Sequence, residues 1–207
     1  MRGLIVLVLA MLIAGVAPVF AGDWTATRLR GVVFEHVNGE WQGLERGDVV
    51  PDSRVVRTGS GRVTLVRGNE TLELGPNTQI RIFDKGGSRP FTTVREEFGE
   101  VSVEAEVRDV QHFAVQTPYL VAVVKGTRFT VEADEQWSGV SVRRGVVYVE
   151  NLIDGSNTLL RAGQSARTVA GARLEVDGRG ELPEVVGGLE VPVDECEERL
   201  GRALLGH

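Results

Sequence analysis

The sequence predicts an all-β protein, built either as an antiparallel β-sandwich or as a rolled, β-helix-like domain, with a short C-terminal helix. Apolar and polar residues alternate in short runs over most of the chain, as they do in strands with one buried face. Turn signals rich in Gly, Asn, Asp and Pro separate these runs about every 8–12 residues. The 207-residue chain also contains 26 glycines and favours Val, which suits strands and tight turns.

Residues 1–21 have the features of a secretory signal peptide. Arg2 supplies a positive charge, residues 4–16 are an unbroken apolar run, and Val19 and Ala21 are small residues that suit a cleavage site. The apolar run is shorter than the roughly 20 residues that a membrane-spanning helix needs. We therefore expect cleavage after Ala21, export to the periplasm, and a mature chain that does not span the membrane. The alternative is an uncleaved membrane anchor.

A β-domain is expected over residues 31–178, after an extended lead-in at residues 22–30. Its first alternating run, residues 31–37, ends at Asn38 and Gly39, and this dipeptide is the strongest short signal for a hairpin. Further alternating runs, separated by turns, continue from there. Such regular spacing of short strands indicates a sandwich, a barrel or a rolled sheet.

The centre of the predicted domain is the segment 112–133. Two strands, 113–116 and 119–124, would meet at a corner formed by Thr117 and Pro118, because proline cannot donate a hydrogen bond to a strand ladder. The second of these strands is apolar throughout, as expected of a strand that is buried on both faces.

Three other segments complete the expected β-domain and its exit. Residues 92–99 fit either a strand or a helical turn. Residues 137–142 and 145–150 are expected to pair as a hairpin. A linker over residues 179–193, rich in Gly and Pro, would follow the domain.

The last segment, residues 194–207, predicts a short amphipathic helix. Asp194 is a suitable N-cap, acidic residues occupy the first turn, and arginines follow later. Leu200, Ala203 and Leu204 would lie on one face of this helix, at i, i+3 and i+4. The sequence leaves open whether that face packs on its own domain or on a partner.

Charge, cysteine and histidine content narrow the function classes. The net charge is −6 and no basic block stands out, so nucleic acid is not expected as a partner. Cys196 is the only cysteine, so an internal disulfide is excluded. His36, His112 and His207 share no metal-binding spacing, and no metal site is expected. Alternation from Phe113 predicts that His112 lies on a polar face as a surface histidine.

The sequence predicts no catalytic and no cofactor-binding residue. Ser60 lies in a TGSGR turn, which is not the GxSxG motif of a nucleophile elbow. Glutamates on the polar faces of strands leave a carboxylate-dependent hydrolase as a less favoured alternative; they are Glu73, Glu100, Glu104, Glu106 and Glu132. Three tryptophans could belong either to the core or to a binding face for a small molecule or a cell-wall glycan; they are Trp24, Trp41 and Trp137.

Three blocks of sequence resemble the FecR family of periplasmic β-domains. Residues 55–82 contain a V-x-T-G start and an L-x-L strand, residues 113–131 contain F-x-V-x-T-P and then G-T-x-F-x-V, and residues 139–169 end in L-x-x-G-Q. The residues of these motifs are expected to be structural; they are Thr58, Gly59, Thr117, Pro118, Gly126, Thr127, Phe129, Gly145, Gly163 and Gln164. Lys125 stands where many members have Arg.

The resemblance implies an all-β domain used in envelope signal transduction. The best-known members are anti-sigma regulators of iron uptake, with a cytoplasmic anti-sigma region and a transmembrane helix before the β-domain. Residues 1–21 are too short for such a region, so the expected form is a stand-alone exported domain. We expect it to act as a sensor, adaptor or scaffold that contacts an envelope or periplasmic protein.

Overall fold

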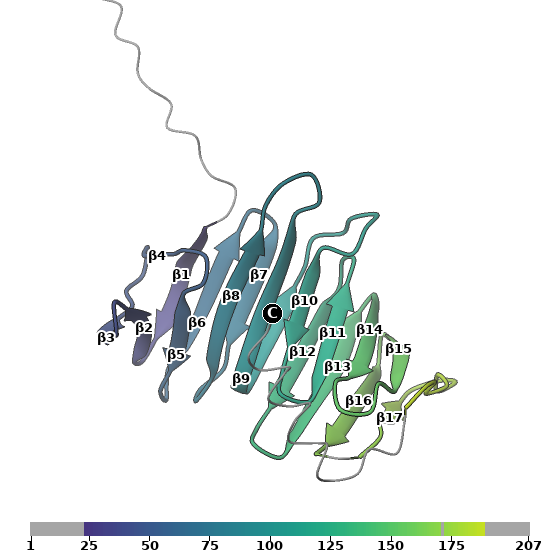
Figure 1. Ribbon diagram of the computed structural model, residues 1–207. Helices are drawn as coiled ribbons and strands as arrows, with labels where there is room; N and C mark the ends of the chain where they lie inside the picture. Colours follow the sequence, from purple (N-terminus) through teal and green to yellow (C-terminus); the bar gives the residue numbers. More distant parts are fainter. Residues whose placement is uncertain (1–22, 171, 189–207) are drawn as a thin grey trace, which may run out of the picture.

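The computed structural model describes residues 23–170 and 172–188, which form 17 β-strands and no helix (Figure 1). The predicted signal peptide and C-terminal helix lie outside the described residues. The strands are β1 Trp24–Arg30, β2 Val33–Val37, β3 Glu40–Gly43, β4 Val49–Val50, β5 Val55–Thr58, β6 Arg62–Arg67, β7 Glu70–Leu74, β8 Gln79–Lys85, β9 Phe91–Glu104, β10 Phe113–Gln116, β11 Leu120–Val124, β12 Arg128–Ala133, β13 Trp137–Arg144, β14 Val146–Asn151, β15 Asn157–Arg161, β16 Gln164–Val169 and β17 Glu175–Gly178.

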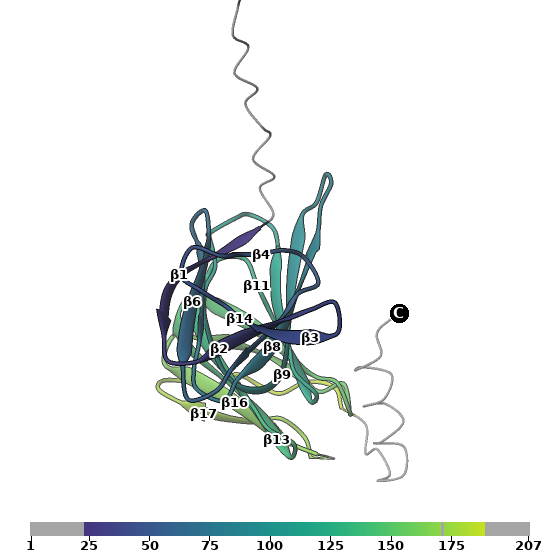
Figure 2. The same ribbon diagram turned by 90° about the vertical axis from the view of Figure 1, so that its left-hand side faces the viewer.

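The strands form two hydrogen-bonded layers, which the end-on view in Figure 2 shows curving around a shared interior. Layer A has the order β4-β1-β6-β7-β9-β12-β13-β16-β17. Layer B has the order β3-β2-β5-β8-β9-β10-β11-β14-β15. The all-β prediction is therefore confirmed.

Strand β9 belongs to both layers. Its first part, up to Phe98, pairs with β8 and β10 in layer B, and its second part, from Gly99, pairs with β7 and β12 in layer A. Gly99 has φ +112°, and a Cβ at this position would lie 2.3–2.6 Å from atoms of Thr78. Glycine is required here because a side chain would be strained in this conformation and would also overlap with Thr78. The stretch 92–99, which fits two structures by sequence, is thus a strand.

One expectation about strand direction is wrong. β10 runs parallel to β9, with Phe113 beside Thr92 and Gln116 beside Arg95, so the sheet is mixed and not wholly antiparallel. The two strands can be parallel because residues 105–112 carry the chain back to the starting end of β9. A connection of this kind is what parallel neighbours need, since a tight hairpin can only join antiparallel strands.

After β9 the chain alternates between the layers, two strands at a time. The pairs β10-β11 and β14-β15 lie in layer B, and the pairs β12-β13 and β16-β17 lie in layer A. The predicted hairpin of residues 137–142 with 145–150 is therefore wrong, because β13 and β14 lie in different layers. The chain crosses between them at Gly145, which has φ +90° and leaves only 2.6 Å between a built Cβ and Thr127 Cγ2.

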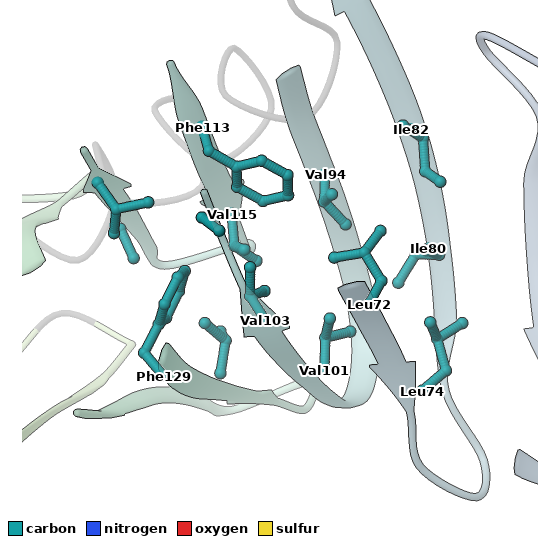
Figure 3. Close-up of a cluster of buried hydrophobic side chains, with 14 of the residues drawn as sticks. Leu72, Leu74, Ile80, Ile82, Val94, Val101, Val103, Phe113, Val115 and Phe129 are labelled. Carbon is teal, nitrogen blue, oxygen red and sulfur yellow. The ribbon is translucent and has the colours of Figure 1, made fainter. Parts of the chain in front are cut away.

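The core lies between the layers and consists mainly of Val, Leu and Ile from alternating strand positions. Figure 3 shows its central part, which contains Leu72, Leu74, Ile80, Ile82, Val94, Val101, Val103, Phe113, Val115 and Phe129. Burying one such side chain contributes roughly 1.5–3 kcal/mol. Trp24 adds an edge-to-face contact with Phe113, at 6.4 Å between ring centroids.

The two ends of the described chain are part of the layers. β1 lies within layer A between β4 and β6, so the β-structure begins at Trp24, inside the range assigned to a lead-in. Residues 179–186, inside the range assigned to a linker, run beside β15, where Val186 bridges to Asn157. The described residues contain no helix long and apolar enough to cross a membrane.

Candidate functional site

The first motif residues close the turns around β5. Thr58 is buried, and its hydroxyl donates to Gly75 O at 2.7 Å and accepts from the N–H of Thr78 at 2.9 Å. The Gly59 N–H donates to Val32 O at 3.1 Å, and its own carbonyl accepts from Asn77. Both residues therefore hold the turn before β8 against the end of β5.

The middle motif residues form a corner and a crossing. Thr117 and Pro118 lie between β10 and β11, and the Thr117 Oγ1 accepts from the N–H of Leu120 at 3.0 Å. The predicted corner is therefore present. Gly126 and Thr127 lie where the chain leaves layer B for layer A, and a Cβ on Gly126 would lie 2.3 Å from the Cα of Val107. Phe129, on β12, is fully buried in the core.

The last motif residues, Gly163 and Gln164, hold the chain that follows β17. The buried Gln164 side chain accepts from the N–H of Arg161 at 2.8 Å and donates to Glu181 O at 2.9 Å. Gly163 donates its N–H to Val142 O at 2.8 Å and accepts from Arg179 at 3.1 Å. These bonds fix residues 179–181 beside the turn between β15 and β16.

A groove opens where residues 179–186 pass along β15, the last strand of layer B. Asn157 exchanges two backbone hydrogen bonds with Val186, both at 2.9 Å, and the Thr158 hydroxyl donates to Glu184 O at 2.9 Å. Gln164 holds the other end of the segment. The groove between these fixed points has a volume of about 770 Å³. It is lined by Tyr148 and by most residues of the segments 157–164 and 179–186.

The groove combines exposed apolar side chains with charges. Three of the ten large apolar side chains that are exposed in the described chain line the groove; they are Leu159, Leu182 and Val186. Arg161, Arg179, Glu181 and Glu184 also line it. Tyr148 donates to Glu150 at 2.9 Å, and burial together with this hydrogen bond raises the pKa of the Tyr148 hydroxyl. A patch of this kind marks an interaction site.

A buried ionic cluster lies at the other half of the protein, at the end of β6. The Arg67 guanidinium donates to Asp84 at 2.5 Å, to Glu70 at 2.6 Å and to Thr92 at 2.6 Å. Its carbon Cζ also lies 4.4 Å from the ring centroid of Trp24. The cluster joins β6, β7, β8 and β9, and its residues do not line the β15 groove, so we assign it a structural role.

His112 is part of this cluster, and its prediction as a surface histidine is wrong. The side chain is 2% exposed, and its Nε2 lies 3.3 Å from Glu70 Oε1, an ion-pair distance that lacks hydrogen-bond geometry. Alternation does place His112 on the face opposite to Phe113. That face is also covered here, since Ala114 is only 3% exposed, so alternation could not predict exposure.

Glu96 is a second buried carboxyl, on the inward face of β9. It is 1% exposed, and neither of its oxygens has a hydrogen-bond partner among the described residues. Burial, and to a smaller extent the nearby Glu132 and Glu100 carboxylates, raise the pKa of Glu96 well above its usual value of 4.5. The carboxyl is therefore held in its neutral form over a wider range of pH than an exposed glutamate.

The sequence contained a signal for both buried glutamates. Glu70 precedes Leu72 and Leu74 at the spacing of two that defines one face of a strand. Glu96 follows Thr92 and Val94 in the same way. Alternation therefore assigns both carboxyls to the core, although only the structure shows that Glu70 is paired and Glu96 is not.

The five glutamates considered for hydrolase chemistry do not form a catalytic cleft in the described chain. Glu100 and Glu132 are cross-strand partners on the exposed outer face of layer A. Glu73 and Glu104 line a hollow of only about 20 Å³, and Glu106 forms an exposed pair with Arg108. No group of three or more potential metal ligands occurs in the described residues.

The three tryptophans have different positions. Trp24 is fully buried in the core. Trp41 is 42% exposed on β3, with the Arg57 Cζ 4.6 Å from its ring centroid. Trp137 lies in a hollow of about 230 Å³ on the outer face of layer A, with Arg167 stacked on its ring at 4.3 Å.

Comparison with known proteins identifies the central part of the fold. Residues 54–148, from the start of β5 into β14, match the family model described as FecR protein. The resemblance inferred from the motifs is therefore confirmed. No curated protein matches the chain.

Two crystal structures have a similar fold. Both are of a "putative anti-sigma factor" from Parabacteroides distasonis ATCC 8503, and each matches with a TM-score of 0.53 and 19% sequence identity. The match covers 60% of this chain and 59% of that one, so it spans less than two thirds of the other protein. At this identity the similarity shows a shared fold alone.

The ionic cluster gives a prediction for Arg67→Met. The substitution should lower the free energy of unfolding by about 3 kcal/mol, because it removes the guanidinium that binds both the buried Glu70 and the partly buried Asp84. Urea denaturation measures this loss. The matched control is Arg144→Met, whose ion pair with Glu104 is largely exposed and should contribute no more than about 1 kcal/mol. Equal losses in the two variants would contradict a stabilising role for the cluster.

Glu96 gives a prediction about pH. Above about pH 4.5 the unfolded chain loses the Glu96 proton while the folded protein keeps it, so this residue reduces stability as the pH rises. Glu96→Gln should therefore match the wild type near pH 4 and be more stable by about 1 kcal/mol or more near pH 8. Thermal unfolding at the two pH values measures the difference, with the exposed Glu73→Gln as control. A difference that is larger at pH 4 would disprove this account.

Proposed function

We propose, from the FecR domain that residues 54–148 carry, that this protein is a non-enzymatic periplasmic sensor, adaptor or scaffold in envelope signal transduction. It would act through protein–protein contacts at the β15 groove. The single observation that carries this proposal is the combination of a FecR domain with a large, partly apolar groove at the edge strand next to it.

The position of the groove suggests that one part of the chain supplies the fold and a later part supplies the binding surface. The matched segment supplies the centre of both layers, from β5 into β14. Apart from Tyr148, every residue that lines the groove comes after that segment. The family framework would thus hold the fold, and the residues after it would determine which partner binds.

The edge of β15 offers backbone groups to a partner. Asn157 uses its N–H and C=O for Val186, and the N–H of Arg161 is bonded to Gln164. Alternate residues of a strand point their backbone groups to the same side, so those of Leu159 face the groove. An extended segment of a partner could pair with Leu159 and place an apolar side chain next to Leu182.

Two further observations support signalling in the envelope. The features of residues 1–21 favour export. The crystal structures with the similar fold are described as those of a putative anti-sigma factor, a title that agrees with a role in signalling. The proposed role is therefore to act in signalling through direct contact with another protein.

A small-molecule or cell-wall glycan site at Trp137 is the second candidate. Trp137, Arg167 and Glu132 line one hollow, which is the combination of an aromatic ring and charges that such a ligand needs. Its volume of about 230 Å³ is below the roughly 300–1,000 Å³ of most ligand sites. The groove at β15 exposes a strand edge at Leu159, which favours a protein partner, and a hydrolase has the least support.

The test places a photoreactive amino acid at Leu159 in cells that make the protein. Leu159 is 52% exposed, so the replacement should not disturb the fold. We expect the protein in the periplasmic fraction, with Gly22 at its N-terminus, and a discrete crosslinked envelope protein after irradiation. The matched control carries the same amino acid at Val107, which is 75% exposed and lies far from the groove in sequence.

Three results would oppose the proposal. A cytoplasmic protein would contradict export. The same crosslinks from both positions, or none from Leu159, would contradict a partner site at the groove. Binding of cell-wall fragments that is lost in Trp137→Ala, without a crosslink at Leu159, would favour the second candidate.

A further inference from the structure

The outer surface of layer B continues from the groove as an apolar face. The cross-strand register puts Val123, Tyr148 and Leu159 side by side on β11, β14 and β15. Alternation adds Val121 and Val146 to the same surface. We call these five residues the outer apolar face. They are half-buried or exposed, and residues 179–186 line the groove beside Leu159 and Tyr148.

The described chain ends at the border of this face. A Cβ on Gly187 would lie 3.2 Å from Gly155 O, and one on Gly188 would lie 3.1 Å from atoms of Asp154 and Ser156. These contacts place the end of the described chain at the turn between β14 and β15. Gly188 therefore lies beside the start of β15, the strand that carries Leu159 of the outer apolar face.

We propose that residues 194–207 of the same chain dock on the outer apolar face. Five linking residues, 189–193, can span up to about 17 Å. A helix over the 14 residues that follow would be about 21 Å long. Strands of a sheet are about 4.8 Å apart, so such a helix is long enough to cross β15, β14 and β11.

The chemistry of the segment fits the surface. Its predicted stripe of Leu200, Ala203 and Leu204 supplies apolar side chains for Leu159 and Tyr148. The carboxylates of its first turn, Asp194, Glu195, Glu197 and Glu198, fit Arg161 and Arg179, which line the groove. Glu181 and Glu184 also line the groove, and the later Arg199 and Arg202 can face them.

The consequence for regulation rests on the proposed function. If the groove receives a partner, residues 194–207 and that partner compete for Leu159. Docking of the segment and binding of the partner then exclude each other, which lowers the apparent affinity of the partner.

The test uses the single cysteine of the chain, Cys196, which lies inside the segment. A nitroxide is attached to Cys196 in the purified protein, with residues 189–207 intact, and the relaxation of backbone amide protons is measured by NMR. We expect strong broadening at Val146, Leu159 and Leu182 and none at Val63, which lies in layer A. The matched variant Leu200→Asp/Leu204→Asp changes only the predicted stripe and should remove the broadening.

A second experiment distinguishes docking within one chain from docking between two copies. It mixes spin-labelled protein that carries no isotope with isotope-labelled protein that carries no nitroxide. Broadening that appears in this mixture would mean that a second copy supplies the segment, and it would overturn docking in cis. Broadening elsewhere, or nowhere, would show that the segment does not cover the face. No partner is present in this experiment, so its result is independent of the crosslinking result at Leu159.

Discussion

Strand β9 is the only described strand that hydrogen-bonds in both layers, and the arrangement of its neighbours depends on this. Its bend at Gly99 fixes where layer B ends and layer A begins. Its first part carries Thr92, which accepts a hydrogen bond from Arg67 and so connects the strand to the ionic cluster. Its second part places Val101 and Val103 in the core. The layers are therefore two halves of one cooperative structure and not two separate sheets.

This architecture separates stability from recognition. The ionic cluster, the glycine crossings and the core occupy the part of the chain that matches the FecR model, or lie against it. The groove lies at the other end of layer B, where Gln164 and Val186 hold residues 179–186 against β15. An edge strand exposes backbone groups that can pair with another chain. Residues 179–186 cover much of this edge, so only a short part of β15 stays open to such pairing.

Alternation and turn signals predicted most strands, because burial on one face imposes a period of two on the sequence. They could not predict which strands pair. β13 and β14 are adjacent in sequence yet lie in different layers, since Gly145 permits a crossing as well as a hairpin turn. The groove was not predictable either, because its walls come together through contacts of Asn157, Thr158 and Gln164 with residues 17–29 positions later in the sequence. Exposure of His112 was misjudged for a similar reason, as coverage of a face depends on distant segments.

The most direct test of the shared-strand architecture is native-state hydrogen exchange measured in increasing denaturant. The account predicts that the amides of Val94, in the layer B part of β9, and Val101, in the layer A part, exchange with the same free energy of opening. That value should equal the free energy of global unfolding, because neither layer can open while β9 stays paired in the other. Exchange of one part at a clearly lower free energy would show that the layers unfold separately, and it would contradict the account.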